Sequence, residues 1–192
     1  MSIQPKRRLT PEEYLEIERK AEYKSEYFNG EMFAFAGASF KHNTIIINLI
    51  LHLGPEVRKR KCNIHSNDMR IKVSATGLYT YPDVFIVCNK PQFEDEHEDI
   101  ILNPIVIIEV LSPSTENYDR GTKFAHYRTI NSLSDYILVA QDKIHVEHYA
   151  RQSDSSWLLT EYGSILDKFQ IESVGCELSV AKIYENLEIE NR

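Results

Sequence analysis

Two short, almost wholly apolar runs, each with one carboxylate, constrain this chain more than any other feature of its sequence. Residues 84–87 read Val-Phe-Ile-Val directly after Asp83, and residues 106–111 read Val-Ile-Ile-Glu-Val-Leu, which places Glu109 among branched aliphatic side chains. Apolar runs of this length predict buried β-strands. A carboxylate in such surroundings is costly to ionise unless a positive charge lies nearby. We therefore expect a cationic partner beside these acids.

That positive charge has more than one candidate source. A divalent cation is one, because hard oxygen ligands suit Mg²⁺ and Mn²⁺. Alternatively, Glu109 pairs with a buried arginine or lysine, or it points outward from an edge strand. Taken singly, neither Asp83 nor Glu109 decides between a metal site and a structural role.

The remaining sequence alternates helical and strand patterns. Helices are expected from residue 11 to about 21 and over 42–60, 119–130 and 180–187, and strands over 69–73, 81–88, 105–111, 136–140, 144–149 and 157–162. Asn29-Gly30 predicts a hairpin, and Gly54-Pro55 is expected to end or kink the second helix. This order predicts one α/β (α+β) domain over residues 1–192, with a mixed central sheet flanked by helices and additional antiparallel C-terminal strands.

The charge of the chain limits its partners. Lys and Arg total 22 against 29 for Asp and Glu, so the net charge is −7. The overall field repels nucleic acid. Any nucleic-acid role must therefore rest on a local basic patch or on bound cations.

The cysteines and the termini favour a cytoplasmic protein. Cys62, Cys88 and Cys176 are few, far apart and without CxxC spacing, which favours thiols that act as small hydrophobic residues in a reducing cytosol. No apolar run of signal-peptide length follows the N-terminus, and the apolar stretches are too short to span a bilayer. We expect no membrane partner.

One ordered set of motifs is more specific than composition. Pro82-Asp83, followed 26 residues later by Glu109-Val110-Leu111, resembles the PD-(D/E)xK nuclease motif with Leu111 at the lysine position. Twelve residues after Leu111 stands Lys123, between Asp119 and Tyr127 at helical spacing. Further matching segments lie at residues 23–31, 42, 68–70, 79–83, 109–115, 119–127 and 132–139. Together, over about residues 9–184, they resemble the Uma-two family of restriction endonucleases, formerly a domain of unknown function.

The resemblance implies a restriction-endonuclease-like core and hydrolysis of phosphodiester bonds in DNA with Mg²⁺ or Mn²⁺. It implies that Asp83, Glu109 and the Val110 carbonyl are metal ligands, and that Glu26 is the N-terminal acid that completes the site. Lys123 would replace the catalytic lysine from a helix, where it would orient or deprotonate water or stabilise charge in the transition state.

Other interpretations of these residues stay open. Lys123 would otherwise form an i,i+4 salt bridge with Asp119 on a solvated helix face. His42 would either bond a phosphate or be a first-turn residue of its helix. Residues 145–148, His-Val-Glu-His, are expected in an exposed late strand rather than in a metal site. A catalytically silent nuclease-fold module for binding or regulation is the alternative function, and the net negative charge favours it.

We also expect a homodimer, because many enzymes of this fold class cut two strands with two paired active sites, and closed two-fold dimers are the commonest oligomers. Tyr149, Trp157 and Tyr162 are candidate interface residues. In the alternative, they pack on the core of their own domain.

Overall fold

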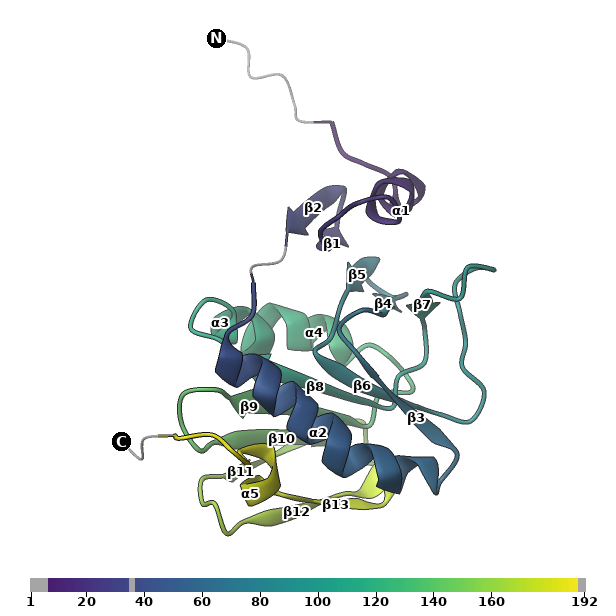
Figure 1. The fold of residues 1–192 in the computed structure, drawn as a ribbon. Helices are drawn as coiled ribbons and strands as arrows, with labels where there is room; N and C mark the ends of the chain where they lie inside the picture. The colour runs from purple at the N-terminus through teal and green to yellow at the C-terminus, as the bar shows by residue number, and fades with distance from the viewer. Residues whose placement is uncertain (1–6, 35–36, 190–192) are drawn as a thin grey trace.

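The computed structural model describes residues 7–34 and 37–189 of the 192-residue chain (Figure 1). Its helical elements are α1 (Pro11–Glu18), α2 (Phe40–Arg58), α3 (Glu116–Tyr118), a π-helical turn η1 (Asp119–Lys123), α4 (Phe124–Tyr127), a 3-10 turn η2 (Glu172–Val174) and α5 (Val180–Ile183). Its strands are β1 (Ser25–Phe28), β2 (Glu31–Ala34), β3 (Cys62–Ser66), β4 (Arg70–Val73), β5 (Leu78–Thr80), β6 (Val84–Cys88), β7 (Ile100–Ile101), β8 (Val106–Leu111), β9 (Asp135–Ala140), β10 (Val146–Arg151), β11 (Trp157–Tyr162), β12 (Lys168–Ile171) and β13 (Cys176–Ser179).

A mixed six-stranded sheet is the centre of the fold. Its strand order is β11-β10-β9-β8-β6-β3, with β8 parallel to β9 and the other neighbours antiparallel. Alternate β8 side chains enter two cores: Ile108 packs with α2 residues, and Ile107 packs with Tyr127 of α4. Helix α2 crosses one face of the sheet in Figure 1. The predicted α/β class, with a mixed sheet flanked by helices, is confirmed.

The structure changes the predicted second helix at both ends. Helix α2 begins at Phe40, where the Ser39 side chain caps it by accepting the backbone N–H of His42 at 3.1 Å. Pro55 does not end the helix, which continues to Arg58. A proline cannot donate to the carbonyl four residues earlier. That carbonyl belongs to Leu51, whose residue is 62% exposed, so water can replace the missing donor.

A second sheet, which the sequence analysis did not predict, holds the N-terminal part of the chain. Its order is β2-β1-β5-β4-β7. The hairpin predicted at Asn29-Gly30 joins β1 and β2, and both turn residues have positive φ. After β5 the chain passes through Pro82 into β6 of the central sheet, so Asp83 lies where the two sheets meet.

The expectation of three separate thiols is wrong. Cys62 and Cys88 form a disulfide, because the antiparallel register of β3 and β6 places them directly opposite each other with a Cα–Cα distance of 4.0 Å. Their separation of 26 residues gave no sign of this pairing, since β3 itself was not predicted. Cys176 is free and buried. Cysteine usage therefore lends no support to the predicted cytoplasmic location.

Two expectations about the late strands also change. Glu147 and His148 of β10 are buried, so this strand is not exposed as expected. The aromatic residues proposed as an interface contact the core: Phe124 lies 4.7 Å from Tyr149 and 5.3 Å from Trp157 between ring centroids. In the described ranges, no helix has the length and apolar character needed to cross a membrane.

Candidate active site

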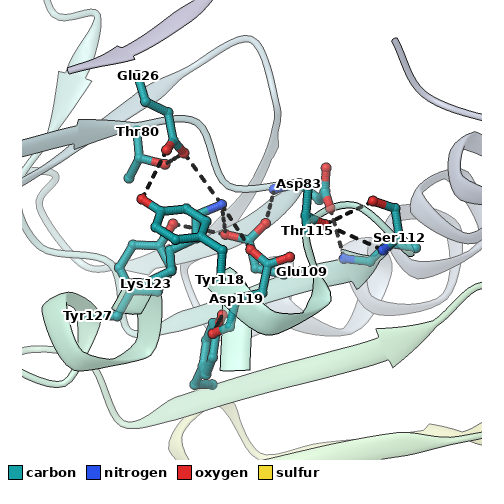
Figure 2. Close-up of polar contacts among 12 residues, drawn as sticks. Glu26, Thr80, Asp83, Glu109, Ser112, Thr115, Tyr118, Asp119, Lys123 and Tyr127 are labelled. Atoms are coloured by element: carbon teal, nitrogen blue, oxygen red, sulfur yellow. Dashed lines mark hydrogen bonds and ion pairs between the residues drawn. The ribbon is translucent and has the colours of Figure 1, made fainter. Parts of the chain in front are cut away.

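The two acids of the apolar runs lie side by side at the junction of the sheets. Asp83 directly precedes β6, and β6 pairs with β8 in a register that sets Val84 opposite Ile108, so the next pair outward is Asp83 and Glu109. The Asp83 N–H lies 3.3 Å from Glu109 Oε2, and the Val110 N–H donates to Asp83 Oδ2 at 2.8 Å (Figure 2). The backbone thus fixes both carboxylates.

Lys123 reaches this pair from the helical segment. Its Nζ lies 2.8 Å from Glu109 Oε1 and 3.5 Å from both Glu26 Oε1 and Asp119 Oδ1. The Lys123 side chain is only 5% exposed. The predicted alternative of a salt bridge on a solvated face is therefore wrong: Asp119 does pair with Lys123, but in the interior of the protein.

A π-helical turn carries this lysine. Residues 119–123 form η1 between the short helices α3 and α4, and both Asp119 and Lys123 are buried. The expected single helix over 119–130 is in fact this composite segment, which begins at Glu116 and ends at Tyr127. The Tyr136 hydroxyl of β9 donates to the Asp119 carbonyl at 3.0 Å and ties the turn to the central sheet. Such turns occur frequently at functional sites.

Glu26 enters the same cluster from β1 of the second sheet. Its Oε1 accepts a hydrogen bond from the Thr80 hydroxyl, and its Oε2 accepts one from the Tyr118 hydroxyl at 3.1 Å. Figure 2 shows these groups around the Lys123 ammonium. The four side chains singled out from the sequence, those of Glu26, Asp83, Glu109 and Lys123, thus lie together.

Burial controls the protonation of the central pair. Burial, together with the charges of Asp83 and Asp119, raises the pKa of Glu109 to about 8, although the Lys123 ammonium lowers it in part. Burial opposes the charge of Lys123, but Glu109 and the other acidic groups around it outweigh burial and raise its pKa well above the usual value. Lys123 is therefore an ammonium ion at neutral pH.

The donor chemistry of the cluster fits a hard divalent cation. Four carboxyl groups (Glu26, Asp83, Glu109 and Asp119) surround one ammonium, which leaves an excess of acidic groups. Over residues 7–34 and 37–189, no three His, Cys, Asp or Glu side chains are arranged to hold a metal ion. Two carboxylates are nevertheless enough for Mg²⁺, which usually keeps several waters.

A family model named Uma2 and described as "Putative restriction endonuclease" matches residues 11–181. The chain belongs to the Uma2 family. Two relatives from Synechocystis sp. (strain ATCC 27184 / PCC 6803 / Kazusa) carry the names "Uncharacterized protein sll1609" and "Uncharacterized protein slr1290". The first is 42% identical over 153 residues, 80% of this chain and 86% of the relative. The second is 36% identical over 180 residues, 94% of this chain and 93% of the relative.

The fold of this Uma2 chain is that of a solved structure. The crystal structure of "a putative nuclease belonging to DUF820" from Anabaena variabilis ATCC 29413 superposes with a TM-score of 0.75 at 18% sequence identity, covering 91% of this chain and 97% of that one. At this identity the likeness establishes a shared nuclease-type fold. The roles of individual residues stay predictions.

Several groups in the Uma2 site escaped the sequence analysis. Tyr127 donates its hydroxyl to Glu109 Oε1 at 2.8 Å, and only its spacing from Lys123 pointed to it. Thr80 and Tyr118, which bond Glu26, carried no sequence signal. His42, left open above, places Nε2 at 3.2 Å from Asp83 Oδ2.

Proposed function

We propose that this chain is a divalent-metal-dependent endodeoxyribonuclease that hydrolyses phosphodiester bonds in DNA. Membership of the Uma2 family and the nuclease-type fold support a nuclease in general. The observation that carries the finer proposal is the buried contact of Glu109 with Lys123 beside Asp83, where acidic groups outnumber cations. Such an excess of buried carboxylates calls for an added cation.

Asp83 and Glu109 would hold the cation, together with the Val110 carbonyl. Along an extended strand the N–H and C=O of one residue face the same neighbour, and the Val110 N–H faces Asp83. A bound Mg²⁺ or Mn²⁺ supplies neutralisation of the scissile phosphate and activation of water. Asp83, whose side chain is 16% exposed, lies on the solvent side of the pair.

Lys123 would act as a cation and not as a base. Because the surrounding acids keep its pKa well above the usual value, it holds its proton at neutral pH. A protonated lysine can donate hydrogen bonds to a phosphate oxygen and stabilise the charge that develops there. Of the roles expected for this lysine, proton removal from water is thus the least suitable.

The remaining groups would position Lys123 and Glu109. The Tyr127 hydroxyl and the Lys123 ammonium both contact Glu109 Oε1, and together they would restrict rotation of that carboxylate. Glu26 of β1 and Asp119 of η1 lie at equal distances from Nζ and would hold the ammonium in place. Positioning of this kind is worth a large share of a catalytic barrier.

Cleavage of DNA by purified protein, with Mg²⁺ or Mn²⁺ and with chelator, tests the proposal. We expect cleavage only with metal, and a loss of at least about 100-fold in Glu109→Gln and Lys123→Ala. The matched control is Asp135→Asn. Asp135 is a buried acid at the N-terminal end of β9, three residues along the strand from the partner of Glu109, and it bonds His148 and Ser173. Cleavage that persists with chelator, or in Glu109→Gln, would contradict the proposal.

A silent nuclease-fold module for binding or regulation is the second candidate. It is favoured by the ion pair itself, because Lys123 already compensates part of the buried charge of Glu109. The net charge of −7 also favours it. If the chain binds Mn²⁺ and DNA but cleaves no single- or double-stranded substrate, this second candidate replaces the first.

A further inference from the structure

A cavity of about 690 Å³ lies beside the helical segment that carries Lys123. Phe124 comes from that segment and Arg128 directly follows it, while Tyr149 and Arg151 come from β10 and Trp157 from β11. Phe124 follows Lys123 directly in the chain, so the cavity wall begins one residue from the candidate active site. In the described part of the chain, the contacts of Lys123 involve none of these five side chains.

Arg151 is a fixed cation in the wall of this cavity. Its Nη2 donates to the carbonyls of Arg128 and Ile130, both at 2.8 Å, and its guanidinium lies 4.7 Å from the centre of the Trp157 ring. Its Nε is closed off from solvent and has no hydrogen-bond partner among the described residues. Arg151 therefore offers the cavity the positive charge of its guanidinium and not this donor.

The chemistry of the walls specifies the ligand further. Two arginines supply positive charge in a chain whose net charge is −7, which is the local basic patch that contact with nucleic acid requires. Trp157 and Tyr149 supply aromatic surface, on which unpaired bases stack in single-strand binding sites. One acid lies at the rim, since Asp154 accepts hydrogen bonds from the N–H and hydroxyl of Ser156, a wall residue.

We propose that this cavity binds one phosphate and the adjoining unpaired base of the nucleic-acid strand that enters the active site. The phosphate contacts Arg128 and Arg151, and the base packs against Trp157. This inference rests on the proposed function for its choice of substrate. Arg128 follows Lys123 by five residues, a rise of about 7.5 Å along a helix and a turn of about 140° around its axis. A strand that contacts both places therefore passes around the helical segment.

Trp157 is the only tryptophan in the chain, so its fluorescence reports on this cavity alone. Single-stranded and duplex oligonucleotides are titrated into Glu109→Gln protein with chelator, at several salt concentrations. We expect saturable quenching, stronger with the single strand. Arg128→Ala should weaken binding several-fold. It should also reduce, by about one, the slope of the logarithm of the binding constant against the logarithm of salt concentration. Trp157→Ala, measured by fluorescence anisotropy of labelled oligonucleotide, should weaken binding about fivefold or more.

Two matched variants control for charge alone. Arg58→Ala removes an exposed arginine at the end of α2 and should leave binding unchanged. Asp154→Asn removes the rim acid and should strengthen binding. Equal effects of Arg128→Ala and Arg58→Ala, or binding without any change in Trp157 fluorescence, would overturn the inference. If Arg128→Ala and the Trp157 variant, each with Glu109 intact, cleave as fast as the wild-type protein, the cavity proposal alone is overturned. Fluorescence quenching without cleavage overturns the nuclease alone.

Discussion

Glu109 is the residue on which the charge balance of the site depends. It lies in the middle of a strand whose other side chains are all apolar, and its contacts are the Lys123 ammonium, the Tyr127 hydroxyl and the Asp83 backbone. Burial nevertheless raises its pKa to about 8. Without an added cation, the folded protein therefore holds a proton on Glu109 at pH values where the unfolded chain does not.

This difference predicts how stability depends on pH. The usual pKa of 4.5 applies to the unfolded chain, so the contribution of Glu109 is fully present below about pH 4.5 and is lost as pH rises through 8. In chelator, the wild-type protein should lose free energy of unfolding relative to Glu109→Gln between about pH 5 and 8, by an amount on the order of a few kcal/mol. Lys123 does not titrate in this window, because its pKa lies well above 10.5.

Denaturant unfolding of both proteins across that pH range is the measurement. Asp119, whose pKa burial also raises, is present in both proteins, so the difference reports Glu109 together with its effect on the pKa of Lys123. A constant difference between the two proteins at all pH values would show that Glu109 is ionised throughout in the folded state.

The sequence identified the ionic residues of the site but not their neutral partners. Asp83 and Glu109 were marked by a spaced motif and by apolar runs in which carboxylates are rare, and Lys123 was marked by the resemblance to the family. Thr80 and Tyr118 reach the site only through the folding of the second sheet and the helical segment. Hydroxyl residues occur throughout the chain, so no local pattern could mark these two.

At the scale of single elements, helix α2 shows which features of a strand or helix are predictable. Its length predicted a helix correctly, but its apolar composition predicted burial all round, whereas Ile47 and Leu51 are exposed. The effect of Pro55 depended on which side of the helix faces water. Strands β6 and β8 were predicted because burial on both faces leaves an unbroken apolar run. Strands β5 and β7, with three and two residues, are too short for any periodicity.

Gly54 in α2 provides a test at this scale. Apart from its neighbours in the chain, a Cβ built there meets only Ile64 Cγ2, at 3.7 Å, which is an ordinary contact. Glycine in a helix interior is less favourable than alanine by about 0.5–1 kcal/mol. Because a Cβ here also crowds the ring of Pro55, Gly54→Ala should stabilise the protein by less than this amount. Denaturant unfolding measures this change.

Gly175 is the matched control for that substitution. Its φ is +55°, and a Cβ there would lie within 3 Å of the Arg60 guanidinium. Gly175→Ala should therefore destabilise the protein. If Gly54→Ala destabilises the protein as much as Gly175→Ala does, the backbone and packing around Gly54 are tighter than this account holds.

For the whole molecule, we propose a homodimer in the cytoplasm. Pairing of two active sites remains the reason for a dimer, since Tyr149 and Trp157 contact Phe124 in their own chain and are weaker interface candidates than expected. The single domain over residues 1–192 likewise stays a prediction. Light scattering at working concentration should give twice the mass of 22.4 kDa. A monomeric mass at every concentration tested would reject the dimer.

The central claim is that Asp83 and Glu109 form a divalent-metal site, and a crystal structure with Mn²⁺ tests it most directly. The account predicts an anomalous peak between these two carboxylates, about 2.1 Å from an oxygen of each, with Lys123 beside it. The same soak of Glu109→Gln crystals should leave no peak. If wild-type crystals soaked in Mn²⁺ show no metal at this position, and Glu109 and Lys123 remain paired, the account is contradicted.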